Sequence, residues 1–221
     1  MEKKEFYKRH LPHFQQSGQA YFVTWCLKDA VPPKAFSDYT LQLQQLKIAI
    51  SDEKSNLEKL NELKFQYAIL RKKYIKAFDD LLHLQTKTLV DLSKDVNTKI
   101  VVDALRFWEG KRLQNDAFCV MPNHVHWVFT IMDKDQNSEP IYLQDILQSV
   151  KRFTANKINQ AEKISGTLWH SESFDTTIRN DKHKYNAINY SLNNPVVAGL
   201  VENWWEWSGN FVNEDWLSAF F

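Results

Sequence analysis

Residues 113–132 of the chain are LQNDAFCVMPNHVHWVFTIM, and this stretch predicts two β-strands joined by a tight turn. Residues 113–121 and 125–132 are rich in apolar, β-branched and aromatic side chains, which favour strands. The Pro122-Asn123 pair between them is typical of a turn. We therefore expect an antiparallel hairpin at the centre of a sheet.

The sequence on either side predicts one further strand before the hairpin and alternating helices and strands after it. Residues 21–27, Tyr-Phe-Val-Thr-Trp-Cys-Leu, predict a strand. The remaining expected elements are a helix over 97–109 that ends at Gly110, a helix over 143–160, a strand over 173–178, and a helix from Asp181 to Asn194. Pro195 disfavours further helix, and the tryptophan-rich residues 201–221 are expected to pack over the core.

A long helical stretch from about residue 37 to 85 interrupts this pattern, and we expect a helical insertion over about 37–95. Apolar side chains recur every three or four residues, and no glycine or proline breaks the stretch. It either extends from the domain or folds back as a hairpin near residues 51–56, where cap-type residues cluster. The mixed charges of this insertion are typical of a helix face that is exposed to solvent. The alternative is that the insertion forms the interface of a dimer.

Composition indicates a globular protein, because 43% of the residues are hydrophobic, 14% are aromatic and only five are glycine. The net charge of +1 does not decide for or against nucleic acid, since a basic surface can be confined to one face. Cys26 and Cys119 lie in apolar runs without metal-site spacing, which favours buried thiols in a reducing compartment. With no secretory signal and no apolar run of about 18 residues, we expect a cytoplasmic protein without a membrane partner.

The first candidate for chemistry is the pair His124 and His126. Residues i and i+2 of a strand project from the same face, so both imidazoles can reach one ion. A pair of this kind also occurs as ordinary surface or core-edge histidines. A metal site therefore needs a third ligand.

The second candidate is the pair Tyr190 and Asn194, which lie one helical turn apart on a common face. Such a helix presents a phenol and an amide together. The alternative is a packed aromatic side chain followed by an ordinary asparagine near the end of a helix. The two pairs have to be judged jointly.

Taken jointly, they resemble the single-tyrosine HUH transposases, and most closely the REP-associated tyrosine transposases. Three blocks in the same order carry the resemblance. These are His10-Leu11-Pro12-His13-Phe14 with Tyr21-Phe22-Val23-Thr24, then Val120-Met121-Pro122-Asn123-His124-Val125-His126, then Tyr190 followed by Asn193-Asn194-Pro195-Val196-Val197-Ala198-Gly199-Leu200-Val201. The blocks cover nearly the whole chain, and many relatives also carry a charged helical insertion after the first strand.

The resemblance implies an α+β fold with a ferredoxin-like antiparallel sheet, forming a single domain over residues 1–221. It also implies that His124 and His126 bind a divalent metal, that Asn194 occupies the third-ligand position, and that Tyr190 is the nucleophile. Mg²⁺ is the expected cofactor, with Mn²⁺ as the alternative. Val197 and Thr176-Thr177 stand where relatives usually have basic residues, which puts the affinity for DNA in question more than the chemistry.

The implied reaction is cleavage and rejoining of single-stranded or hairpin DNA. A phosphodiester repels nucleophiles because its oxygens are negative, and a phenol, with a reference pKa near 10, is mostly protonated at neutral pH. A divalent ion lowers this barrier by neutralising charge and fixing the line of attack. Tyr190 would then form a 5′-phosphotyrosine link and release a 3′-hydroxyl, which conserves the bond for later rejoining.

Several cations and histidines are candidates for contacts with DNA phosphates. A basic set expected near the site comprises Lys151, Arg152, Lys157, Arg179, Lys182 and Lys184, and the opening block adds Arg9, His10 and His13. The alternative is an ordinary solvated surface. His170 and His183 either touch DNA or pack locally.

Two other functions compete with strand transfer. One is a domesticated protein of the same fold that binds folded single strands without cutting them. The other is a metal-dependent hydrolase of small molecules, which would need a closed pocket over His124 and His126. The choice between monomer and homodimer stays open.

Overall fold

The computed structural model describes residues 6–8, 12–14, 18–32, 34–84 and 87–220. Its strands are β1 (Phe6–Lys8), β2 (Pro12–Phe14), β3 (Ala20–Leu27), β4 (Leu113–Val120), β5 (His124–Ile131), β6 (Trp169–Thr177) and β7 (Asn210–Val212). Its helices are α1 (Ser37–Asp52), α2 (Leu57–Leu82), α3 (Asp95–Arg106), α4 (Leu143–Ala161), α5 (Asp181–Val197) and α6 (Glu214–Leu217), with a 3₁₀ turn, η1, over Trp204–Glu206. The two opening strands pair with each other in a small antiparallel sheet.

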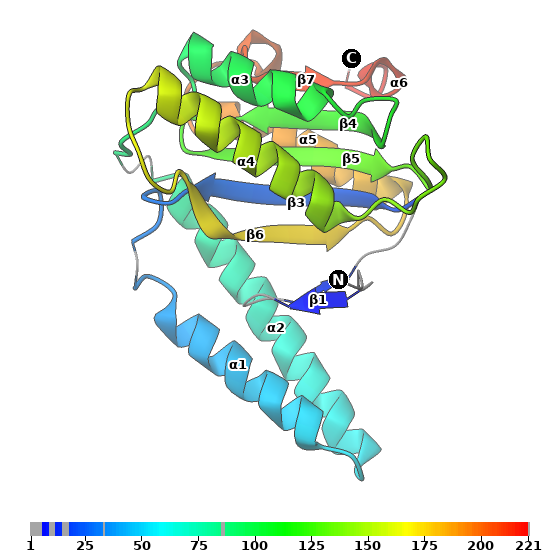
Figure 1. The fold of residues 1–221 in the computed structure, drawn as a ribbon. Coiled ribbons are helices and arrows are strands. Elements are labelled where there is room, and N and C mark those ends of the chain that lie inside the picture. The colour runs from blue at the N-terminus through cyan, green and yellow to red at the C-terminus, as the bar shows by residue number, and fades with distance from the viewer. Residues whose placement is uncertain (1–5, 9–11, 15–17, 33, 85–86, 221) are drawn as a thin grey trace. The chain divides into compact units, whose positions relative to one another are not determined.

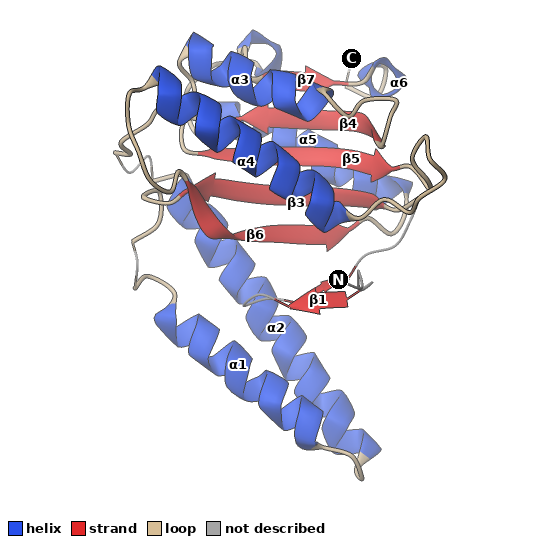
Figure 2. Ribbon diagram, viewed as in Figure 1, coloured by secondary structure: helices blue, strands red, loops and turns tan. Residues whose placement is uncertain are grey.

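Five antiparallel strands form the main sheet in the order β6-β3-β5-β4-β7 (Figures 1 and 2). Leaving aside the insertion and β7, the chain runs β3, α3, β4, β5, α4, β6. This β-α-β-β-α-β order, with the first and third strands paired at the centre, is ferredoxin-like. The predicted fold class is therefore confirmed, and β5, which carries the histidines, is the middle strand.

Helices cover both faces of this sheet: α3 and α4 lie in front of it and α5 lies behind it (Figure 1). Strand alternation sends Trp25 and Trp127 to the front face, where their rings meet edge to face. Trp169 also points forward, since its indole donates to the Lys151 carbonyl of α4. On the rear face Ala117 and Val128 form a buried cluster with residues of α5. The histidine face is therefore the rear face.

The insertion forms a separate compact unit over Asp29–Lys87. This unit ends eight residues before the expected boundary near residue 95. Helices α1 and α2 pack against each other, so the insertion is a helical hairpin. Its turn lies at residues 53–56, within the cluster of cap-type residues. The Asn56 side chain accepts from the Lys59 amide and caps α2. Within the unit, Phe36 packs against the rings of Tyr74 and Phe78.

Some expected boundaries were wrong, although the elements themselves are confirmed; α3 begins at Asp95 and ends at Arg106, before Gly110. The α5 helix does not end at Asn194 but continues through Pro195 to Val197, and Asn180 rather than Asp181 caps it. Proline removes only its own N–H bond, and in a last turn the following amides still close the helix: Ala198 N donates to the Asn194 carbonyl. Strand β6 begins at Trp169, four residues before the predicted start at Ser173. The pairing of β6 with β3 continues beyond a β-bulge, which lengthens the strand.

The C-terminal residues do pack over the core as predicted, and they also supply the edge strand β7, which was not expected. Trp204 and Trp216 contact the rear cluster. The β7 strand pairs with β4 through Phe118 and Phe211, whose rings are stacked. Among the helices that the structure describes, none combines the length and apolar composition that a bilayer crossing requires.

A buried ion pair fixes α5 on the sheet. Lys184 Nζ of α5 lies 2.7 Å from Asp116 Oδ1 of β4 and 3.0 Å from the Thr130 hydroxyl of β5. Asp116 also accepts from Thr130 at 3.1 Å and from the Trp216 indole at 3.2 Å. The expectation that Lys184 tracks DNA phosphates is therefore corrected, because this ammonium is already paired inside the protein. The pair sets where the rest of α5 lies.

We predict that Asp116→Ala lowers the free energy of unfolding by about 2–4 kcal/mol, because it leaves a largely buried ammonium without its charge partner. Chemical denaturation followed by circular dichroism measures this. The control is Lys99→Ala, which breaks an exposed pair with Asp103 and should cost less than about 0.5 kcal/mol. Equal losses in the two variants would contradict a clamping role for Asp116.

Candidate active site

His124 and His126 are fully buried on the rear face of the central strand, with their rings directed at each other. The two Nε2 atoms lie 3.0 Å apart. Each Nδ1 atom has its own partner: the Asn123 amide oxygen at 2.6 Å from His124, and the Thr24 hydroxyl at 2.8 Å from His126. Two neighbouring polar groups thus fix the orientation of both rings.

Tyr190 lies beside this pair at the boundary between core and solvent. Its ring meets the His126 ring edge to face at 5.2 Å between centroids and the Phe22 ring at 5.9 Å. The side chain is 37% exposed, so the phenol can be approached from solution. The predicted nucleophile and one predicted metal ligand are therefore neighbours in space.

Asn194 follows one turn after Tyr190. Lys184 meets Thr130 and Tyr190 meets His126, so α5 runs along β5 toward His124, and the next turn carries Asn194 in that direction. Asn194 is 1% exposed, and neither its Oδ1 nor its Nδ2 has a hydrogen-bond partner among the described residues. A buried amide without partners is costly, so Asn194 is a candidate ligand for a group from outside the chain.

The two facing imidazole nitrogens, 3.0 Å apart, and a buried amide without partners among the described residues form a donor set that is chemically suited to a divalent metal. Among the described residues, no three His, Cys, Asp or Glu side chains are placed to hold a metal together.

The two cysteines also face this site. Cys26 pairs with His124 across β3 and β5, and Cys119 pairs with His126 across β4 and β5, so all four side chains share the rear face. Both cysteines are free and buried, as expected. Burial raises the pKa of the Cys119 thiol well above its usual range, which keeps this sulfur neutral and a poor metal ligand.

Three site residues were not singled out from the sequence: Thr24, Asn123 and Glu172. Thr24 and Asn123 could have been suspected, because each is a polar residue within an otherwise apolar part of its motif. Glu172 of β6 lies at the β-bulge between Trp169 and Ser173, where the pairing with β3 shifts. It is 4% exposed, and neither carboxylate oxygen has a partner among the described residues.

The predicted basic set is divided between the two faces of the sheet. Lys151, Arg152 and Lys157 lie on α4, in the layer opposite the histidines, so their expected position near the site was wrong; helix α4 crosses the front face. Lys151 donates to the His170 carbonyl, while Arg152 and Lys157 are exposed. Arg179 and Lys182 are exposed at the start of α5, on the side of Tyr190, where contact with a phosphate chain remains a prediction.

The remaining candidates are local or fall outside the described side chains. His183 Nδ1 accepts from the Arg179 amide, and His170 Nδ1 accepts from the Glu172 amide, so each has a structural role. Arg9 and His10 lie outside the described residues, and His13 is described only as part of the backbone of β2. Their contact with DNA stays untested.

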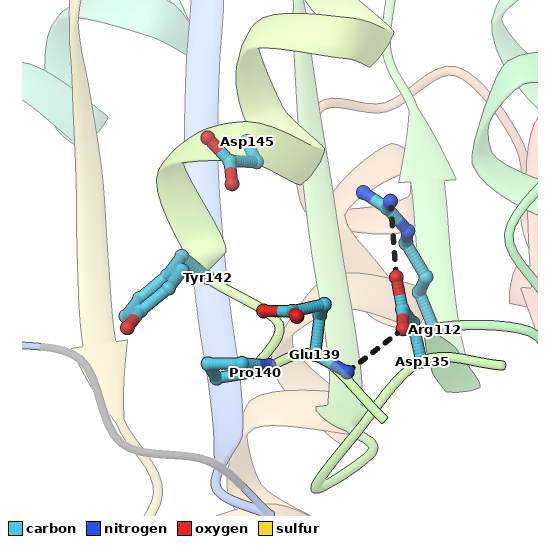
Figure 3. Close-up of a pocket in the computed structure, with 6 residues that line it drawn as sticks. All are labelled: Arg112, Asp135, Glu139, Pro140, Tyr142 and Asp145. Atoms are coloured by element: carbon cyan, nitrogen blue, oxygen red, sulfur yellow. Dashed lines mark hydrogen bonds and ion pairs between the residues drawn. The ribbon is translucent and has the colours of Figure 1, made fainter. Parts of the chain in front are cut away.

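A pocket of about 330 Å³ lies away from the histidine pair (Figure 3). It is lined by Arg112, Asp135, Glu139, Pro140, Tyr142 and Asp145. Arg112 precedes β4 and forms an ion pair with Asp135, next to the end of β5 that is farthest from His124. This pocket does not test the hydrolase alternative, which concerns a pocket over His124 and His126.

Comparison with known proteins agrees with the resemblance seen in the sequence. No family model matches the chain. A protein of Haemophilus influenzae, provisionally named a REP-associated tyrosine transposase, is 26% identical over 106 residues, which cover 45% of this chain and 58% of that protein. The chain is similar to REP-associated tyrosine transposases. The alignment thus spans less than two thirds of that transposase relative.

A solved structure of a REP-associated tyrosine transposase bound to a REP hairpin also aligns with the chain. The TM-score is 0.45 and the sequence identity is 15%, over 95% of this chain and 82% of the transposase chain.

We predict that Asn194→Leu stabilises the metal-free protein while weakening its response to metal. The substitution removes a buried amide without partners, so the free energy of unfolding should rise by about 1 kcal/mol or more. Thermal denaturation with and without Mn²⁺ measures both effects, since a ligand of the native state raises the midpoint. In Asn194→Leu the increase of the unfolding midpoint on addition of Mn²⁺ should be mostly lost.

The control for this experiment is Asn189→Leu, the same change on the exposed side of α5. It should leave the Mn²⁺-dependent rise intact. An Asn194→Leu protein that is destabilised, or that keeps the full response to Mn²⁺, would show that the amide serves the fold and not a metal.

Proposed function

We propose that this protein is a metal-dependent strand transferase of single-stranded DNA that forms a 5′-phosphotyrosine intermediate, with hairpin-containing DNA as its substrate class. The observation that carries the proposal is the exposed phenol of Tyr190 beside two buried imidazoles whose Nε2 atoms face each other. The similarity to a protein named as a REP-associated tyrosine transposase supports a strand-transfer reaction on DNA. Cleavage of DNA in the cell would place the protein in the cytoplasm.

In this proposal the Nε2 atoms of His124 and His126 and the Asn194 amide oxygen hold one divalent ion, with Mg²⁺ as the physiological cofactor and Mn²⁺ as a substitute. When bound, the ion supplies charge neutralisation at the scissile phosphate. Thr24 and Asn123 keep the imidazoles oriented through their Nδ1 atoms. Both rings are fully buried, so these protein partners hold their orientation.

Tyr190 performs the covalent step. Its oxygen bonds to phosphorus as the bond from phosphorus to the 3′-oxygen breaks, the phenol loses its proton, and the departing oxygen takes one up as a 3′-hydroxyl. The number of phosphate ester bonds is unchanged, so the reverse reaction can rejoin a strand. The edge-to-face contacts with His126 and Phe22 restrict the ring, which favours one line of attack.

The proposal predicts a covalent adduct that depends on one hydroxyl group. Purified protein is incubated with Mg²⁺ or Mn²⁺ and a pool of hairpin oligonucleotides with randomised single-stranded flanks. Denaturing gels and mass spectrometry should detect DNA linked to Tyr190. Tyr190→Phe should reduce adduct formation by at least about 1,000-fold while hairpin binding persists, because only the nucleophile is removed.

Tyr185→Phe is the matched control, because Tyr185 lies on the same helix and is equally exposed, at 37%. This variant should form the adduct at the normal rate. An adduct that persists in Tyr190→Phe would reassign the nucleophile. Tight hairpin binding with no adduct in either metal would instead favour a DNA-binding protein that does not cut.

A further inference from the structure

We propose that helix α2 (Figure 1) is the contact surface of a symmetric homodimer, in which α2 of one copy packs antiparallel against α2 of a second copy. The surface is one exposed stripe along the helix, which we call the α2 stripe. Its members follow one another at intervals of three and four residues: Glu58, Glu62, Phe65, Ile69, Lys72 and Lys76. Such intervals keep side chains on one side of a helix and are those of a coiled-coil seam. This contact lies within the insertion and does not depend on the proposed strand transfer.

The α2 stripe lies on the side of the helix that faces away from its packed side. Tyr74 and Phe78 are buried, and at 3.6 residues per turn they fall opposite the stripe. At the centre of the stripe, Phe65 and Ile69 are 66% and 41% exposed. Exposed apolar side chains are common on protein surfaces, so the charges beside them have to decide what this side of the helix does.

The charges of the stripe are sorted by sign along the helix. Glu58 and Glu62 precede the apolar centre, whereas Lys72 and Lys76 follow it. The helix dipole favours the same order, but its effect fades within the first and last turns. Glu62 lies in the second turn, and Lys72 lies ten residues before the end of α2 at Leu82. The dipole therefore does not account for the inner charges.

A two-fold axis accounts for the complete order. Positions 58 and 76, positions 62 and 72, and positions 65 and 69 are all centred on position 67. When a second copy packs antiparallel about this point, each glutamate meets a lysine and each apolar residue meets the other: Glu58 with Lys76, Glu62 with Lys72, and Phe65 with Ile69. Every contact then occurs twice, as this symmetry requires. A parallel pair of helices would place like charges opposite each other, which is destabilising.

The charged side chains of the stripe are available to a second copy. Among the described residues, neither Glu58 nor Lys72 forms an ion pair. Lys76 pairs with Asp80 at 2.8 Å, but both side chains are largely exposed, at 75% and 62%. An exposed pair of this kind contributes little, so Lys76 can exchange it for a glutamate of the second copy.

A second copy also supplies apolar contacts that the helical hairpin has few of. Of the residues in α1 and α2, four are buried: Leu43, Tyr74, Phe78 and Leu82. Small units with a core of this size are commonly stabilised by oligomerisation. Burial of Phe65 and Ile69 between two copies adds a second apolar layer on the other side of α2.

The first test measures the mass of the full-length protein at about 100 µM by sedimentation velocity, where it should be a dimer. Phe65→Glu places a charge beside Ile69 at the centre of the contact, so this variant should be a monomer. Phe107→Glu is the matched control, because Phe107 is 56% exposed and lies outside the insertion. This control should remain a dimer, and circular dichroism should show that both variants are folded.

The second test reverses the charges at each end of the stripe. A basic chain carries Glu58→Lys with Glu62→Lys, and an acidic chain carries Lys72→Glu with Lys76→Glu. Alone, each chain places like charges at every ion pair of the contact, so dimerisation should weaken by at least about 30-fold. Mixed in equal amounts, the two chains have opposite charges at every pair and should form a heterodimer. A heterodimer also shows that both chains are folded, since each has to present an intact helix.

Three results would overturn the α2 contact: a wild-type protein that stays monomeric at this concentration, a dimer that survives in both charge-reversed chains, or a mixture without heterodimer. A monomeric protein whose acidic chain binds hairpin DNA more weakly than the wild type would assign the basic half of the stripe to DNA instead. The Tyr190 adduct can form in either case, so dimerisation and strand transfer are tested separately.

Discussion

Two imidazoles buried side by side in the middle of a sheet are the constraint on which the rest of the site depends. Burial of polar rings is unfavourable unless each nitrogen finds a partner. The central position of β5 supplies those partners, because strands on both sides hold its backbone and bring Thr24 of β3 across from His126. The sheet therefore sets the distance between the Nε2 atoms before any ligand arrives.

The second requirement is that α5 crosses the sheet in one register. Lys184 anchors its first turns at Asp116 and Thr130, while Ala187 and Leu192 pack in the rear cluster. With these positions fixed, successive turns present an exposed phenol and then a buried amide. An anchor two turns from the site thus decides which side chains reach the histidines, so stability and chemistry depend on the same helix.

Much of this arrangement could be predicted from the sequence. The strands, the helices and the shared face of His124 and His126 follow from local periodicity, which one strand or helix expresses by itself. The helix turn that links Tyr190 and Asn194 is local in the same way. The pairing of these two motifs came from a resemblance to a family and not from the periodicity of either.

What could not be predicted depends on contacts between distant residues. Nothing local to Lys184 indicates a partner 68 positions earlier, and nothing local to α4 shows that it crosses the front face, away from Tyr190. Thr24 belongs to the site because β3 pairs with β5, and only that strand order brings its hydroxyl to His126. On the histidine face burial keeps the Cys119 thiol neutral, and the Asn194 amide has no partner among the described residues, so the polar groups beside the histidine pair are set by the strand order and not by one local motif.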